Sequence, residues 1–297
     1  MLTQKPGIPE IREFTKNSAP LIHCITNPIS IHDCANMILA VGARPIMAEH
    51  PEEVEEITEV SSALMLNLGN ITDARIISMQ RALSTANRKN IPVLLDLVGV
   101  TCSQLRRSFA KQLLSQGVFS VIKGNISEIL AAAELPYHGT GIDAGSQDAV
   151  SVENQAWYCE TARHLAKHLN CTVMATGKKD LIADAENAFL VSNGHAALSG
   201  VTGTGCMVGA LTAAYLPGSK AIFTKSGIFE TSSIIPDKTK VSYGTAAALL
   251  AAVVMGISGE LAAEISKGPG SFQTALLDEV YAMTDETLLE KARLQEF

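Results

Sequence analysis

The chain has 297 residues, of which 47% are hydrophobic and 18% are charged, and its formal net charge is −7. Its basic residues are scattered rather than clustered, which argues against nucleic acid or an anionic membrane surface as a partner. The length and the apolar content suit one large α/β domain over residues 1–297, and no stretch has the composition of a linker.

Hydrophobic periodicity predicts that strands and helices alternate along the first 176 residues. In chain order the pattern gives a helix at 9–16, a strand at 20–25, a helix begun by Ser30, a strand at 45–47, an acidic helix led by Pro51, a strand at 63–67, a helix at 73–89, a strand at 92–96, a helix at 103–115, a strand at 118–123, a helix at 126–133, a helix from about 153 to 169, and a strand at 172–176. Such alternation predicts a mostly parallel central sheet with helices on both faces and right-handed crossovers.

The pattern changes after residue 176. Two short apolar segments, 180–183 and 187–191, predict a small antiparallel hairpin at one edge of the sheet. From Thr204 onward the pattern is nearly all helical, with expected interruptions at Pro217-Gly218, at Pro236-Asp237 and at 268–270. Residues 246–257 are too few to span a membrane and predict a buried helix.

The cysteines and the N-terminus bear on the compartment. Six cysteines form no C-x-x-C pair and no metal-ligand spacing, and no basic segment leads into an apolar one at the start of the chain. We therefore expect a protein of the reducing cytoplasm, without disulfides. Abundant Ala and Gly with few aromatic residues suit close packing between subunits, so we also expect an oligomer.

Polar side chains stand where the predicted parallel strands end, and ligands of such sheets bind at that edge. Two carboxylates among them, Asp96 and Glu128, are the donors that Mg²⁺ uses together with substrate phosphates. A carboxylate at the end of a strand can also serve merely as a helix cap, and that alternative stays open. The set comprises Asn27, Met47, Asn67, Asp96, Lys123, Asn125, Glu128 and Thr176.

The segment Val201-Thr-Gly-Thr-Gly-Cys-Met-Val-Gly-Ala210 runs from a small-residue loop into an apolar helix. Its backbone N–H groups at Gly203, Thr204, Gly205 and Cys206 form a predicted anion hole, because the unpaired amides and the dipole of a helix N-terminus attract phosphate. The same position would favour the thiolate form of Cys206. A tight turn that needs glycine only for packing is the alternative, and the segment lacks the P-loop pattern.

Seven motifs follow one another along the chain: Ile22-His-Cys-Ile-Thr-Asn-Pro28, Gly42-Ala-Arg-Pro-Ile-Met47, Leu95-Asp-Leu-Val-Gly-Val100, Val121-Ile-Lys-Gly-Asn125 with Glu128, Ala175-Thr-Gly177 with Asp180, Val201-Thr-Gly-Thr-Gly-Cys206 and Gly268-Pro-Gly-Ser-Phe-Gln273. Together, and in this order, they resemble the hydroxyethylthiazole kinases of thiamine salvage, which have the ribokinase-like fold. This chain has Leu97 and Lys123 where the family commonly has proline and arginine.

The resemblance implies an ATP- and Mg²⁺-dependent transferase that phosphorylates the primary hydroxyl of 4-methyl-5-(2-hydroxyethyl)thiazole, as a homotrimer with its sites between subunits. It implies contacts from Met47, Gly203 and Asn27 to the thiazole and from Lys123 and Thr176 to ATP. Asp96 and Glu128 would lie near Mg²⁺, and Cys206 would take the place of the catalytic aspartate of other ribokinase-like enzymes.

Two other functions stay open at this point. One is a related ribokinase-like kinase that acts on another small alcohol, since the acceptor depends on the shape of the pocket around Met47. The other is a non-catalytic protein that binds a small heterocycle in the same pocket. The anion loop, the two carboxylates and Lys123 together favour catalysis.

Overall fold

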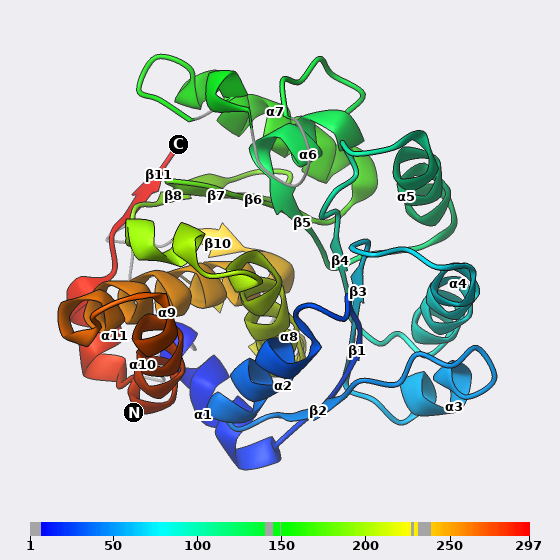
Figure 1. Ribbon diagram of the computed structural model, residues 1–297, viewed down its shortest axis with the longest axis horizontal. Helices are drawn as coiled ribbons and strands as arrows, with labels where there is room; N and C mark the ends of the chain where they lie inside the picture. The colour runs from blue at the N-terminus through cyan, green and yellow to red at the C-terminus, as the bar shows by residue number, and fades with distance from the viewer. Residues whose placement is uncertain (1–6, 140–144, 149, 227–228, 231–238) are drawn as a thin grey trace.

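The alternating apolar strands and amphipathic helices assemble into a nine-stranded sheet with helices on both faces (Figure 1). The computed structural model describes residues 7–139, 145–148, 150–226, 229–230 and 239–297. The strand order β11-β8-β7-β6-β5-β4-β3-β1-β2 places the earliest strands at one edge and the last strand at the other. The predicted α/β architecture is confirmed.

Six neighbouring strands, from β2 to β6 in the sheet, are parallel, and β7, β8 and β11 add antiparallel pairings. The strands are β1 (Leu21–Ile25), β2 (Arg44–Ile46), β3 (Ala63–Asn67), β4 (Val93–Asp96), β5 (Val121–Asn125), β6 (Thr172–Thr176), β7 (Asp180–Ala183), β8 (Ala188–Val191) and β11 (Leu294–Glu296). A separate antiparallel pair joins β9 (Phe229–Glu230) to β10 (Lys240–Val241).

The helices form two layers, one on each face of the sheet (Figure 1). One face carries α3 (Val54–Glu59), α4 (Asp73–Arg88), α5 (Gln104–Gln116), α6 (Ile126–Ala132) and α7 (Gln155–Leu169). The other carries α1 (Ile8–Ser18), α2 (Ile31–Ala40), α8 (Thr204–Ser226), α9 (Tyr243–Ile265), α10 (Pro269–Ala282) and α11 (Asp285–Lys291). Two short 3₁₀ helices cover Ser146–Asp148 and Ala196–Gly200.

Each face of the sheet has its own hydrophobic core. Alternate strand residues point to opposite faces, so Cys24 and Met65 pack beneath α2 and α8, whereas Leu64 and Leu66 pack beneath α4. Strands buried on both faces are continuously apolar, as a parallel sheet requires. This rigid sheet fixes the positions of the side chains at its strand ends.

One predicted interruption in the C-terminal half is wrong. Pro217-Gly218 does not interrupt α8, although a proline inside a helix removes a hydrogen bond. Close packing replaces what is lost: Tyr215 and Leu216 are fully buried, and a Cβ on Gly218 would lie 3.0 Å from Phe14 Cδ1 of α1. The expected break at Pro236-Asp237 lies outside the described residues.

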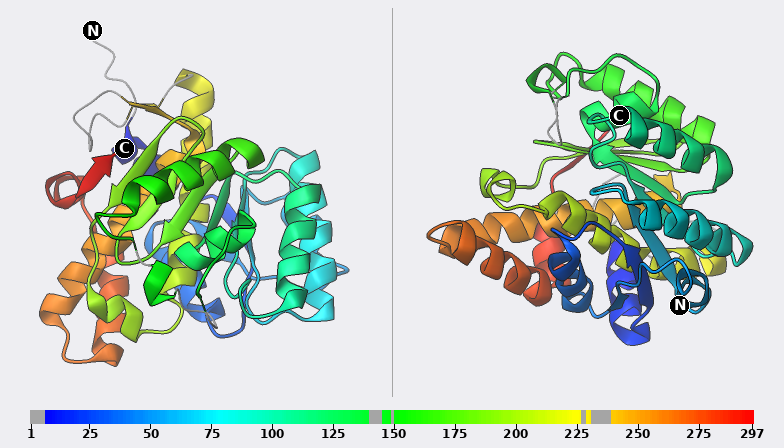
Figure 2. Two further views of the ribbon diagram at one scale, coloured as in Figure 1. Left: turned by 90° about the horizontal axis from the view of Figure 1, so that it is seen from above. Right: turned by 45° about the vertical axis from the view of Figure 1, so that its right-hand side comes forward.

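The C-terminus also differs from the helical expectation. The last strand, β11, pairs with β8 and so lies outside the predicted hairpin of β7 and β8 (Figure 2). Leu294-Gln-Glu296 is too short and too polar for its periodicity to indicate a strand.

Helices α8 and α9 are long and apolar enough to cross a membrane by length and composition alone. In the structure 72% and 83% of their most apolar windows are buried, so both are core helices of this fold. The predicted buried helix at 246–257 is confirmed within α9. All six cysteines are free.

Candidate functional site

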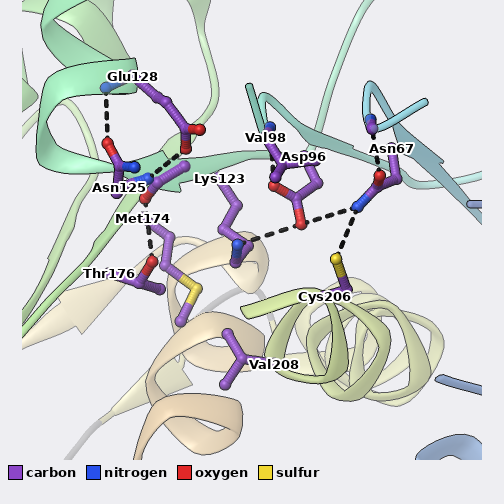
Figure 3. Close-up of polar contacts among 12 residues, drawn as sticks. Asn67, Asp96, Val98, Lys123, Asn125, Glu128, Met174, Thr176, Cys206 and Val208 are labelled. Atoms are coloured by element: carbon purple, nitrogen blue, oxygen red, sulfur yellow. Dashed lines mark hydrogen bonds and ion pairs between the residues drawn. The ribbon is translucent and has the colours of Figure 1, made fainter. Parts of the chain in front are cut away.

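The carboxyl ends of β1, β3, β4 and β5 bring the predicted polar side chains to one edge of the sheet (Figure 3). Asn67, Asp96 and Lys123 occupy paired positions of three adjacent strands. All three side chains are buried, because α8 covers this part of the edge. The parallel topology therefore places an amide, a carboxylate and an ammonium group side by side.

The carboxylate of Asp96 is the centre of this group. Its Oδ2 accepts hydrogen bonds from Lys123 Nζ at 3.1 Å and from Asn67 Nδ2 at 3.2 Å, and its Oδ1 accepts one from the Val98 amide at 3.2 Å. Burial raises the pKa of the Asp96 carboxyl, and Lys123 opposes that shift. Burial alone would lower the pKa of the Lys123 ammonium. Electrostatic interactions with Asp96, Cys206 and Glu128, of which the one with Asp96 contributes most, outweigh burial and raise this pKa.

Glu128 lies in the first turn of α6, next to the end of β5. Its Oε2 accepts from the Asn125 amide at 2.7 Å, its Oε1 accepts from the Gly99 amide at 2.6 Å, and Asn125 Oδ1 accepts from the Glu128 amide at 2.9 Å. This is a capping box. Burial raises the pKa of Glu128 to about 7, and the Asp96 carboxylate adds to the shift, although the two amides oppose it.

The predicted anion loop leads directly into α8. Gly203 has φ +88°, a left-handed conformation that favours glycine. The amides of Gly203, Thr204, Gly205 and Cys206 donate to no acceptor within the described ranges. The first turn of this 23-residue helix therefore has unpaired amides within the described residues, and the binding of an anion there stays a prediction.

Lys123 approaches this open helix end from β5. A Cβ on Gly205 would lie 3.7 Å from Lys123 Nζ, and one on Gly209 would lie 3.6 Å from Lys123 Cδ. The loop itself contains no cation, but the fold supplies one to it. Backbone N–H groups, the helix dipole and an ammonium thus converge, which is the combination that stabilises a transferring phosphoryl group.

Cys206 begins the buried part of α8 and is 7% exposed. Its Sγ accepts hydrogen bonds from Asn67 Nδ2 at 3.3 Å and from Asn27 Nδ2 at 3.4 Å. Burial raises the pKa of the Cys206 thiol and the Asp96 carboxylate adds to this, while Lys123 opposes it. The raised pKa runs against the expectation of a thiolate at this helix N-terminus, and burial beside the Asp96 carboxylate is its cause.

Of the remaining predicted residues at the same edge, Asn27 belongs to this contact network, whereas Thr176 and Met47 lie outside it. Thr176 ends β6, where its hydroxyl donates to the Gly124 carbonyl at 3.3 Å, and Met47 follows the edge strand β2 and is half-buried against the core. Asn27, predicted to contact substrate, is largely occupied by Cys206, Asn67 and the Ser30 amide. Within the described residues no cluster of three or more His, Cys, Asp or Glu side chains is arranged to hold a metal ion.

Sequence reasoning assigned no role to two residues that complete the site. Asn67 stands at the strand edge and bridges Asp96 to Cys206. Gly99 adopts φ +75° and donates its amide to Glu128. The position of Asn67 at the end of a predicted strand could have indicated a role at the site. The hydrogen bond between Gly99 and Glu128 has no such signal, because it depends on how the segments after β4 and β5 lie relative to each other.

Comparison with known proteins identifies the family. The model of the hydroxyethylthiazole kinase family matches residues 11–286. The chain is 42% identical over 288 residues to hydroxyethylthiazole kinase 2 of Clostridium botulinum strain 657, covering 97% of this chain and 100% of the relative. Hydroxyethylthiazole kinase of Clostridium botulinum strain Eklund 17B is 40% identical over 284 residues, covering 95% and 94%.

Solved structures agree with this assignment. Hydroxyethylthiazole kinase from Pyrococcus horikoshii OT3 superimposes with a TM-score of 0.80 at 31% identity, covering 98% of each chain. A ribokinase-like superfamily protein from Enterococcus faecalis V583, with a TM-score of 0.55 at 11% identity, covering 94% of this chain and 95% of that one, shows the shared fold. With its fold, its edge of polar strand ends and its relatives in agreement, this chain belongs to the hydroxyethylthiazole kinase family.

Proposed function

We propose that this protein transfers the γ-phosphoryl group of ATP to the primary hydroxyl of 4-methyl-5-(2-hydroxyethyl)thiazole, in thiamine salvage. The observation that carries the proposal is the open first turn of α8 facing the ammonium of Lys123. Membership of the kinase family supports ATP as co-substrate and the thiazole as acceptor. Phosphoryl transfer needs mainly positioning and charge stabilisation, and this site offers both.

In this proposal each group at the edge has one task. The amides of Gly203 to Cys206 hold the γ-phosphate, and Lys123 with Thr176 contacts the nucleotide. Met47, Gly203 and Asn27 contact the thiazole. Cys206 orients the acceptor hydroxyl, and its raised pKa suits a thiol that need not remove the proton early, because the transition state is loose.

The carboxylates of Asp96 and Glu128 fit a divalent cation. Within the described residues, Asp96 Oδ1 and each oxygen of Glu128 accept one hydrogen bond, which leaves a lone pair free on each. Both carboxylates are buried near one buried ammonium, that of Lys123, and burial, with a contribution from the Asp96 carboxylate, raises the pKa of Glu128. We propose that both hold Mg²⁺, which neutralises charge on the β- and γ-phosphate oxygens when bound.

We also propose that the protein works in the cytoplasm as a homotrimer with its sites between subunits. Ile29, just before α2, and Leu39, near the end of α2, are 61% and 54% exposed, and a neighbouring subunit would cover them. Light scattering measures the molar mass directly. A monomer of 31.5 kDa in solution would contradict the trimer.

One assay tests the reaction itself. The protein is incubated with ATP, Mg²⁺ and a panel of alcohols that includes the thiazole, and ADP release is followed. We expect release that depends on the thiazole. Preference for a sugar or pyrimidine alcohol would show a related kinase, and no alcohol-dependent release would show a heterocycle-binding protein.

A further inference from the structure

Asn67 is a buried amide with every hydrogen-bonding group used, and it has no task in the reaction described above. It ends β3 and its side chain is 0% exposed. Its partners are the side chains of Asp96, Cys206 and Asn27 and the backbone amide of Gly69. Such a fully satisfied buried network holds its members in one arrangement.

The orientation of the Asn67 amide is fixed by its surroundings. The Gly69 backbone N–H can act only as a donor, and it lies 2.9 Å from Asn67 Oδ1, so that atom is the oxygen. The NH₂ group must then face the other way. Its two hydrogens point to Asp96 Oδ2 at 3.2 Å and Cys206 Sγ at 3.3 Å (Figure 3).

The same argument fixes Asn27, the second donor to the sulfur. The Ser30 amide donates to Asn27 Oδ1 at 3.2 Å, so Asn27 presents its NH₂ to Cys206 Sγ at 3.4 Å and to Asn67 Oδ1 at 3.1 Å. Asn67 therefore holds the sulfur directly and also orients the other amide that holds it. Loss of Asn67 removes its own hydrogen bond to the sulfur and one of the two acceptors that orient the Asn27 NH₂ group.

We infer that Asn67 is a positioning residue that aims the sulfur of Cys206 at the acceptor hydroxyl and ties it to the Asp96 carboxylate. The inference rests on the proposed function, because it assigns Asn67 a role through Cys206 in that reaction. A cysteine side chain has three staggered rotamers, and the two amides select one of them. A misplacement of about 1 Å can reduce catalysis by about 10²-fold.

A double-mutant cycle separates this role from a purely structural one. Asn67→Ala, Cys206→Ala and the double variant are compared with the unchanged protein for kcat, KM for ATP and calorimetric Kd for the thiazole. We expect Asn67→Ala to lower kcat by about 10- to 100-fold while KM and Kd stay within about threefold. In the Cys206→Ala background the same substitution should change kcat by less than about threefold.

Two results would overturn the inference. An equal loss of kcat in both backgrounds would show that Asn67 acts through Asp96 alone, and a raised KM with an unchanged kcat would show a binding role. If Asn67→Ala does not fold, Asn67→Ser, which keeps an oxygen for the Gly69 amide, takes its place in the cycle.

A crystal structure of the ligand-free Asn67→Ala protein tests the inference without any assay of activity. We expect Sγ of Cys206 to leave its rotamer or to occupy more than one. An unmoved sulfur would overturn the inference whatever the substrate is. Conversely, a preference of the unchanged protein for another alcohol would overturn only the proposed acceptor, and the cycle would be run with that alcohol.

Discussion

Helices α8 and α9 each have 23 residues, and their N-termini lie at opposite ends of the parallel strands. The first turn of α9 is closed by the chain itself: Asp184 Oδ2 accepts from the Ser242 amide at 3.2 Å and from the Thr245 hydroxyl at 3.0 Å, and Ser242 Oγ accepts from the Thr245 amide at 3.1 Å. The first turn of α8 has no such cap within the described residues, and Lys123 stands beside it.

This difference in capping distinguishes a helix end that stabilises the fold from one that can bind a ligand. Both helix ends carry the same unpaired amides and the same positive dipole. At α9 the Ser242 hydroxyl caps the Thr245 amide and Asp184 holds that cap in place, so this helix end only stabilises the fold. At α8 the first-turn amides have no such cap within the described residues and lie next to a buried cation, so they are available to a phosphate. Five substitutions or conditions test this comparison, in decreasing order of expected effect.

Gly205→Asp gives α8 the kind of cap that α9 has. The new carboxylate would lie next to Lys123 and occupy the place of the phosphate, so we expect kcat/KM to fall by about 10³-fold while the protein stays folded. Gly205→Ala is the matched control, because among the described residues a Cβ there meets only Lys123 Nζ, at 3.7 Å. Activity of the aspartate variant within tenfold of the alanine variant would show that the phosphate lies elsewhere.

Lys123→Gln removes the charge but keeps an N–H donor for Asp96. We expect kcat/KM for ATP to fall by about 10²-fold, since one charged donor to the phosphoryl group is lost. Lys123→Arg should retain activity within about tenfold, because it keeps the charge. Steady-state kinetics of both variants would disprove the assignment if they were equally active.

Cys206→Ala should lower kcat by about 10- to 100-fold, because the sulfur orients the hydroxyl without being an obligatory base. Cys206→Asp should be tolerated or faster, since a carboxylate is a better proton acceptor. Rapid-quench measurement of a single turnover isolates the chemical step. A loss of several further decades for the alanine variant, with substrate still bound, would indicate an obligatory base.

The stability of the Mg²⁺-free protein should depend on pH through Glu128. Its carboxyl has a pKa of about 7 in the folded protein and an ordinary value of 4.5, so folding favours the protonated form. The stabilisation is full below pH 4.5 and is lost as the pH rises through 7. Urea unfolding should show a fall on the order of 2 kcal/mol between pH 5 and 8.

Glu128→Gln serves as the control for that titration, because glutamine does not ionise. The unfolding free energy of this variant should lack the fall between pH 5 and 8 that Glu128 causes in the unchanged protein. Identical pH profiles for the two proteins would refute the raised pKa. Added Mg²⁺ should stabilise the unchanged protein most at pH 8, where Glu128 is charged.

Asp184→Asn tests the closed end of α9. We expect the unfolding free energy to fall by about 1–2 kcal/mol, because asparagine offers one oxygen where the carboxylate uses both, Oδ2 accepting two hydrogen bonds from α9 and its cap and Oδ1 accepting three from Glu186 and Asn187. The kinetic constants should not change. A large loss of activity without loss of stability would mean that this helix end, too, serves the reaction.

Much of the site could be predicted because parallel topology is simple. Once the strands that carry Asn67, Asp96 and Lys123 at paired positions are neighbours in a sheet, these side chains must meet near one edge. The loop at Gly203 could be recognised because its glycine and threonine composition reflects local backbone conformation.

Long-range packing decided what could not be predicted. The approach of Lys123 to Gly205 depends on where α8 crosses the sheet, and the raised pKa of Cys206 depends on burial next to Asp96. The passage of α8 through Pro217 likewise follows from its packing against α1. None of these features has a signal in the local sequence.

The most direct test of the open helix end is a crystal structure with a non-hydrolysable ATP analogue and the thiazole. We predict γ-phosphate oxygens within about 3 Å of the Gly205 and Cys206 amides, with Lys123 Nζ in contact and the thiazole hydroxyl beside Cys206 Sγ. A γ-phosphate bound away from the first turn of α8, with those amides still free, would contradict the account.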